Sequence, residues 1–110
     1  MRRICRLDEI DEPGAKGLIV HGAIQQHALI VVRWRGQVAV YVNSCPHTGV
    51  NLEWMPDQFF DVDGQYLQCA THGALFRPDN GYCVGGPCAG QSLDRVRSHI
   101  EGEFVLADIP

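Results

Sequence analysis

This 110-residue sequence has a single lysine, and it lacks helical periodicity and long apolar runs. Lys16 is the only lysine, and nine basic residues against thirteen acidic ones give a net charge of −4. Binding to nucleic acid requires clustered basic side chains, so no nucleic-acid partner is expected. The longest apolar runs, residues 28–32 and 38–42, fall far short of the roughly 18 residues of a membrane span, so no membrane partner is expected either.

The first residues and the cysteines bear on the compartment of the protein. Arg2 and Arg3 would suit an export signal, but charged residues follow them where an apolar segment would be needed. We therefore expect a cytoplasmic protein. The five cysteines are an odd number, which argues against a disulfide framework and favours bound metal or free thiols.

Alternation with a period of two runs through most of the chain, and no long window has the spacing of an amphipathic helix. Segments 28–32 and 37–42 are predicted strands, and Arg35-Gly36 between them predicts a tight hairpin turn. Two further strands are expected near the end of the chain, joined by a turn at Glu101-Gly102. A single helical turn is expected at residues 7–10.

These patterns predict an all-β protein with a small antiparallel fold and one domain, residues 1–110. The two ends of the chain are expected to pair in a base sheet. The middle of the chain, from about residue 43 to 90, is expected to hold the functional side chains on loops and short strands.

Two short motifs in this middle region each pair a cysteine with a histidine. Cys45 and His47 form the first pair, Cys69 and His72 the second, and 21 residues separate His47 from Cys69. Both pairs follow predicted strands, so the two loops can approach each other. Glycines follow each pair, at Gly49 and Gly73. Without a Cβ, the backbone there can approach the bound group and present N–H donors to it.

Two thiolates and two imidazoles suit a [2Fe–2S] cluster with mixed ligands. Two ferric ions, two sulfides and two thiolates sum to a neutral cluster, whereas four thiolates would leave it doubly negative. A neutral cluster accepts an electron more readily, so mixed ligands raise the reduction potential. A ligating histidine also keeps one ring nitrogen that can reach the surface, where electrons can leave.

The paired motifs, their glycines and the later Gly-Pro turn at Gly86-Pro87 resemble the Rieske ferredoxins and Rieske domains. The resemblance implies a Rieske-like fold, with base sheets and a cluster-binding subdomain at about residues 43–90. It further implies that Cys45 and Cys69 bind one iron while His47 and His72 bind the other. The protein would then be an electron-transfer protein and not an enzyme, carrying single electrons from a reductase to an oxygenase or other acceptor.

The departures from high-potential Rieske proteins predict a low potential. Those proteins carry an extra cysteine in each loop, where this chain has Val50 and Thr71, so their inter-loop disulfide cannot form here. They also place hydroxyl donors where this chain has Ala74 and Phe76. Hydrogen bonds to the sulfurs stabilise the reduced cluster, so we expect a potential near the lower end of roughly −150 to +300 mV.

Other interpretations remain open. The same four ligands could hold zinc in a structural interaction module, since zinc also accepts two cysteines and two histidines. A cluster could also sense redox state or iron and regulate a partner enzyme. Cys83 and Cys88 are expected to be free thiols, with a disulfide between them as the alternative. Residues 53–64 are expected to form an added loop that leaves the ligands undisturbed and offers a surface for partners.

Overall fold

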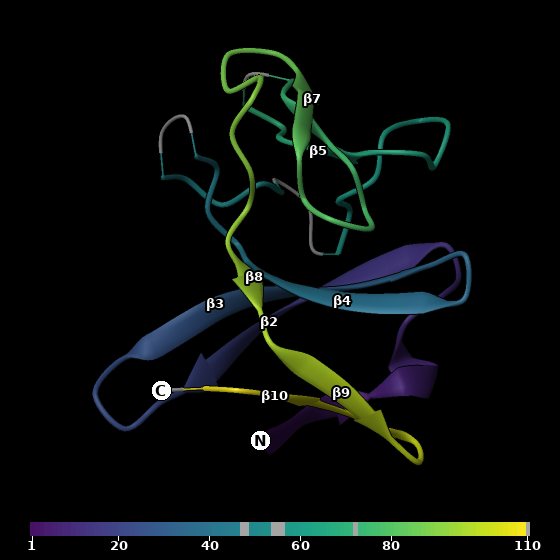
Figure 1. Cartoon of the computed structure of the whole chain (residues 1–110), viewed down its shortest axis with the longest axis vertical. Helices are drawn as coiled ribbons and strands as arrows, with labels where there is room; N and C mark the ends of the chain where they lie inside the picture. Colours follow the sequence, from purple (N-terminus) through teal and green to yellow (C-terminus); the bar gives the residue numbers. More distant parts are fainter. Residues whose placement is uncertain (47–48, 54–56, 72, 110) are drawn as a thin grey trace.

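The computed structural model describes residues 1–46, 49–53, 57–71 and 73–109. In this part of the chain, antiparallel strands form three small sheets that follow one another along the molecule (Figure 1). The elements are β1 (Arg2–Arg6), a 3₁₀ turn η1 (Leu7–Glu9), β2 (Gly14–His21), β3 (Gln26–Trp34), β4 (Gln37–Val42), β5 (Leu67–Gln68), β6 (Leu75–Phe76), β7 (Cys83–Gly85), β8 (Arg95–Val96), β9 (Ser98–Glu101) and β10 (Phe104–Ala107). The predicted all-β antiparallel fold and the turn near residue 7 are confirmed.

The three sheets divide the chain into a base and a loop-rich end. One base sheet has the order β1-β10-β9 and the other the order β2-β3-β4-β8, while β5, β6 and β7 form the third sheet at the opposite end (Figure 1). Pairing of β1 with β10 confirms the prediction that the two ends of the chain share a base sheet. Only Arg97 separates β8 from β9, so the chain passes from one base sheet to the other within a single residue.

The turn between β3 and β4 has the geometry that its sequence predicts. Arg35 and Gly36 both have positive φ angles, of 50° and 76°. A two-residue turn with positive φ at both positions matches the right-handed twist of the flanking strands, and glycine adopts this conformation without a steric penalty. Trp34 therefore pairs with Gln37, which sets the register of the whole hairpin.

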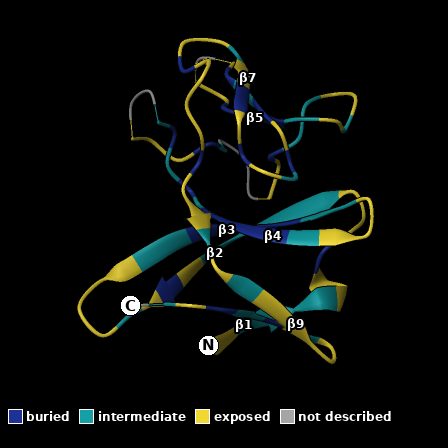
Figure 2. Cartoon of the chain, in the orientation of Figure 1, coloured by how far each residue is buried: buried dark blue, intermediate teal, exposed yellow. Residues whose placement is uncertain are grey.

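Strand β3 is apolar on both faces because it lies between two cores. Leu29 and Val31 pack toward the terminal sheet, whereas Ile30 and Val32 pack toward the loop-rich end. Neighbouring side chains of a strand point to opposite faces, so a strand covered on both sides becomes a continuous apolar run. Figure 2 shows the resulting band of buried backbone in the central sheet.

Tyr41 on β4 connects the central sheet to the loop-rich end. Its side chain is fully buried, and its hydroxyl donates a hydrogen bond of 2.8 Å to the carbonyl oxygen of Pro78. Its ring also lies against Gly81, where an added Cβ would come within 2.9 Å. Burial raises the pKa of Tyr41 to about 12, because the ionised phenolate would lose its hydration.

We expect Tyr41→Phe to have a lower free energy of unfolding than the wild type at neutral pH. In alkali this difference should become smaller. Near pH 7 the variant leaves the Pro78 carbonyl without its donor, at a cost of about 1–3 kcal/mol. Above about pH 10 the tyrosine of the unfolded chain ionises while the folded one stays neutral, which destabilises the wild type by about 1.4 kcal/mol per pH unit. Phenylalanine cannot ionise, so the difference in free energy of unfolding between the variant and the wild type should narrow.

Urea unfolding of both proteins at about pH 8 and about pH 11 measures this effect. A gap that stays constant between the two conditions would show that Tyr41 ionises equally easily in the folded and unfolded chains.

Candidate metal centre

The first cysteine loop follows directly from the end of β4. The N–H of Cys45 donates to the carbonyl of Val50 at 2.8 Å, and the N–H of Gly49 donates to the carbonyl of Cys45 at 2.7 Å. Gly49 has a φ of +77°, a backbone conformation that residues with a Cβ rarely adopt. These two bonds close the loop and hold Cys45 at its base.

The second cysteine loop, after β5, repeats this backbone pattern. The N–H of Cys69 donates to the carbonyl of Ala74 at 2.9 Å, and that of Gly73 donates to the carbonyl of Cys69 at 2.8 Å. Gly73 has a φ of +72°. Closing the two turns thus uses the N–H groups of Gly49 and Gly73 themselves.

A backbone hydrogen bond joins the two loops. The N–H of Ala70 donates to the carbonyl of Leu52 at 2.8 Å, so the residue after Cys69 lies beside the end of the first loop. The prediction that two loops after strands meet is borne out for the residues that the structure describes. The two cysteines lie in one buried core that also contains Leu52 and Ala74.

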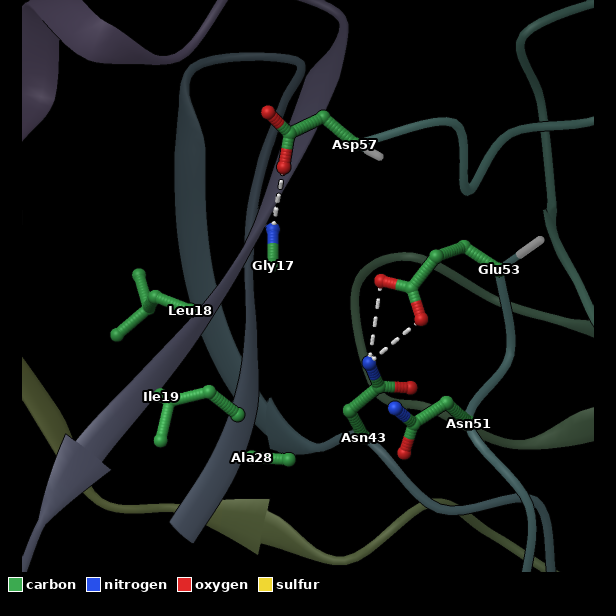
Figure 3. A pocket seen from close by; sticks show the side chains of 8 residues that line it. All are labelled: Gly17, Leu18, Ile19, Ala28, Asn43, Asn51, Glu53 and Asp57. Atoms are coloured by element: carbon green, nitrogen blue, oxygen red, sulfur yellow. Dashed lines mark hydrogen bonds between the residues drawn. The ribbon is translucent and has the colours of Figure 1, made fainter. Parts of the chain in front are cut away.

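Asn43, which the sequence analysis did not single out, closes the base of the first loop. Its side chain is only 5% exposed. The side-chain oxygen accepts the N–H of Leu52 at 2.8 Å, and the amide nitrogen donates to both carboxylate oxygens of Glu53, at 2.9 and 3.2 Å (Figure 3). A polar residue at the end of an apolar strand and just before a cysteine is the only signal for this role in the sequence.

The added loop, residues 53–64, is held against the edge strand β2 by the carboxylate of Asp57. The Asp57 side chain accepts the N–H of Gly17 at 2.8 Å, which occupies a donor on the open edge of the sheet. A hollow of about 390 Å³ lies between Asp57, Glu53 and the strands β2 and β3 (Figure 3). Asp57 thus holds the start of this loop against the central sheet, whereas Phe59 and Phe60 pair with Gln68 and Leu67 of the third sheet.

The two predicted cysteine ligands are buried and free. Cys45 is 1% exposed and Cys69 is fully buried, and neither forms a disulfide. The other two predicted ligands, His47 and His72, lie outside the described residues. Within the described residues no group of three or more His, Cys, Asp or Glu side chains is arranged to hold a metal ion. Buried sulfur donors on two joined loops fit a thiolate-bound metal centre whose other ligands come from elsewhere.

The turn after β7 packs against both cysteine loops. Gly86 has a φ of +94°, and a Cβ placed there would lie 2.7 Å from the Cα of Ala74. Cys83 and Cys88 on either side of this turn are buried free thiols whose sulfurs are 3.1 Å apart, which agrees with the expectation of free thiols. Burial, together with the nearby sulfurs of Cys83 and Cys45, raises the pKa of Cys88 to about 12.

No helix in the described part of the chain has the length and apolar character needed to cross a membrane. No curated protein sequence matches this chain. The family model described as the Rieske [2Fe-2S] domain matches residues 2–103.

Solved structures share the fold over nearly the whole chain. The ferredoxin of carbazole 1,9a-dioxygenase from Nocardioides aromaticivorans IC177 has a TM-score of 0.76 and 20% identity, over 99% of this chain and 97% of its own. The Sphingomonas yanoikuyae B1 ferredoxin has a TM-score of 0.75 and 26% identity, over 99% of this chain and 98% of its own. A chain in the complex of reduced oxygenase and oxidized ferredoxin in carbazole 1,9a-dioxygenase has a TM-score of 0.76 and 20% identity, over 97% and 100%.

Proposed function

This chain belongs to the Rieske [2Fe–2S] domain family, and from that premise we propose that it is a one-electron carrier between a reductase and an oxygenase or another acceptor. The observation that carries the proposal is the pair of matching loops, each of which holds a buried free cysteine and is joined to the other by the Ala70–Leu52 hydrogen bond. A bound [2Fe–2S] cluster supplies a centre that takes up and releases single electrons.

The proposed ligands are Cys45 and Cys69 on one iron and His47 and His72 on the other. Deprotonated cysteines provide the soft, anionic sulfur that iron–sulfur clusters require. Burial of both thiols keeps water away from that side of the centre, which protects the iron–sulfur bonds from hydrolysis. His47 and His72 follow their cysteines in the sequence, and we propose that redox partners dock where these two histidines bind the second iron.

The proposed partners follow from proteins with the same fold. Among these structures are ferredoxins, and one is a complex of reduced oxygenase and oxidized ferredoxin. A carrier of this kind needs a donor and an acceptor protein and no substrate pocket of its own. The hollow beside Asp57 is therefore not required for this function, and we assign it no substrate.

Metal analysis and spectroscopy test the proposal directly. We expect iron and acid-labile sulfide in equal amounts, uptake of one electron per chain, and an EPR signal with the low average g value of a cluster with mixed ligands. Rapid reduction by a ferredoxin reductase and rapid reoxidation by an oxygenase would support the carrier role. Zinc alone in the purified protein would exclude it, and a cluster that exchanges electrons slowly but changes partner binding would favour a sensor.

We further expect a low reduction potential, near the lower end of roughly −150 to +300 mV. Ala74 and Phe76 are both fully buried and lie in the same core as the two cysteines, yet neither carries a hydroxyl. Because a hydroxyl donor would stabilise the reduced form, Ala74→Ser should raise the potential. Redox titration measures the shift, and Ala89→Ser on the exposed surface is the matched control that should leave it unchanged.

A potential far above zero in the wild type would contradict this expectation. An equal response of the Ala74→Ser and Ala89→Ser variants would show that the residue at position 74 does not reach the sulfurs of the centre.

A further inference from the structure

Cys83 and Cys88 are the buried reactive groups that the electron-carrier function leaves unused. Cys83 is fully buried and Cys88 is 1% exposed, and both belong to the core that holds Cys45 and Cys69. Their sulfurs are in contact at 3.1 Å. Two thiols that already touch need little movement to reach bonding distance, so the backbone places this pair where a disulfide can form.

The backbone around the pair is closed by hydrogen bonds from both sides. The N–H of Cys83 donates to the carbonyl of Gln91 at 2.8 Å, and the N–H of Gly90 donates to the carbonyl of Cys83 at 3.1 Å. The N–H of Gln91 donates to the carbonyl of Cys88 at 2.9 Å. These bonds hold Cys83 and Cys88 opposite each other across the turn in the dithiol state.

The hydrogen atoms of the two thiols are also accounted for. The thiol of Cys83 donates to the carbonyl of Gly85 at 3.1 Å, so the single S–H of Cys83 is in use. The sulfur of Cys83 is therefore the acceptor of the S–H of Cys88 in the contact between them. A disulfide would replace this weak hydrogen bond by a covalent bond between the same two atoms.

The turn that carries Cys88 is exposed to solvent. Gly86, Pro87, Ala89 and Gly90 are all exposed, although Cys88 between them is buried. Because the turn lies outside the base sheets, its local opening can expose Cys88 to a small reagent while those sheets stay folded. Burial in the closed state should make the reaction slow, since thiols that stay protonated are poor nucleophiles.

We propose that Cys83 and Cys88 form a reversible disulfide, which gives the chain a two-electron thiol–disulfide site beside its candidate metal centre. The oxidant is a low-molecular-weight disulfide such as oxidised glutathione. One cysteine thiolate attacks that disulfide and releases the first reduced thiol, and the second cysteine then displaces the remaining one. Two S–H bonds break, one S–S bond forms between Cys83 and Cys88, and the oxidant leaves as two reduced thiols.

Peptide mapping of the intact holoprotein tests the proposal. The protein is equilibrated without oxygen in glutathione buffers of increasing oxidised fraction, quenched in acid, alkylated with N-ethylmaleimide after denaturation and cut with chymotrypsin. Cleavage after Tyr82 and Leu93 releases a peptide that contains both Cys83 and Cys88, separate from the peptides that hold Cys45 and Cys69. We expect the 83–93 peptide to become unalkylated and two hydrogens lighter, and dithiothreitol to reverse the change.

Two variants sharpen the test. Cys5→Ala removes a thiol in the terminal sheet and should leave the mapping result unchanged, which shows that thiol number alone does not matter. Cys88→Ala removes the partner thiol, so Cys83 should stop at a glutathione adduct. Full alkylation of the wild-type 83–93 peptide in every buffer, or a stable glutathione adduct on it, would overturn the proposal even if Cys88→Ala fails to fold.

The outcome is independent of the proposed electron-carrier function, because the mapping reads the thiols and not the iron. A chain without iron whose 83–93 peptide still becomes oxidised would disprove the carrier and leave the disulfide standing. A protein that retains iron and sulfide but whose 83–93 peptide stays fully alkylated would disprove the disulfide and leave the carrier function standing.

Discussion

Cys69→Ser should yield a colourless protein with almost no bound iron or sulfide. A serine hydroxyl ionises far less readily than a thiol and offers hard oxygen where the cluster requires soft sulfur. Loss of an outer-shell partner already costs about 10–100-fold in metal affinity, and loss of a ligand should cost more. The side chain is fully buried, so no water can readily take the place of the missing sulfur.

The same variant should also be less stable than the wild type. Metal binding contributes to the free energy of folding whenever the unfolded chain does not bind the metal. We therefore expect Cys69→Ser to unfold at a lower urea concentration than the holoprotein. The comparison with the wild type stripped of its metal separates loss of the cluster from the effect of the hydroxyl itself.

Cys5→Ser is the matched control for Cys69→Ser. Cys5 is half-buried on β1 in the terminal sheet, where it packs against the core on the far side of the central sheet. Its replacement removes one thiol but should leave iron, sulfide and the EPR signal unchanged. Equal loss of iron from both variants, or full iron content in Cys69→Ser, would contradict the proposed ligand set.

Gly86→Ala should be the most damaging single substitution in the turn after β7. Gly86 has a φ of +94°, and its missing Cβ would lie 2.7 Å from the Cα of Ala74 and 3.2 Å from its backbone nitrogen. The backbone conformation costs an alanine about 1–2 kcal/mol. The clash adds about 1–3 kcal/mol, since it involves backbone atoms that no side-chain rotation can move.

Gly90→Ala separates these two costs. Gly90 lies in the same turn with a φ of +92°, but nothing lies within 4 Å of the Cβ that it lacks. Both variants carry the conformational cost, and only Gly86→Ala carries the clash. We expect urea to bleach the visible absorption of Gly86→Ala at a clearly lower concentration than that of Gly90→Ala, which should in turn bleach before the wild type.

The position of the clash also gives Gly86→Ala an expected effect on the metal centre. Ala74 accepts the N–H of Cys69, so a displaced Ala74 should disturb the second cysteine loop. Faster loss of iron to a chelator is therefore expected for Gly86→Ala than for Gly90→Ala. Equal sensitivity of the two variants to urea and to the chelator would show that the clash at Gly86 does not disturb the second cysteine loop.

Local patterns in the sequence predicted β3, β4 and the last strands of the base, but not the edge strand β2. Arg35-Gly36 predicts the turn between β3 and β4, because few residues tolerate two successive positive φ angles. The apolar run at 28–32 predicts a buried strand, since a strand covered on both faces cannot alternate. The two Cys-His motifs predict the cofactor because their spacing and residue types suit few other centres.

Contacts between residues distant in the sequence were not predictable in the same way. The role of Asn43 depends on Leu52 and Glu53, which the folded first loop brings back to the end of β4. The sequence motifs likewise did not show that the N–H groups of Gly49 and Gly73 close the two cysteine loops. Hydrogen-bond partners depend on how the chain folds back on itself, which residue types alone do not specify.

The sequence by itself determined the fold class and the family and led to the proposed sulfur donors, because backbone propensity, strand periodicity and metal chemistry all act over short segments. Only the tertiary structure decided that Ala70 joins one cysteine loop to the other, that Gly86 rests on Ala74, and that Cys83 and Cys88 touch. Each of these contacts arises when three sheets pack in one arrangement, and packing is a property of the whole chain.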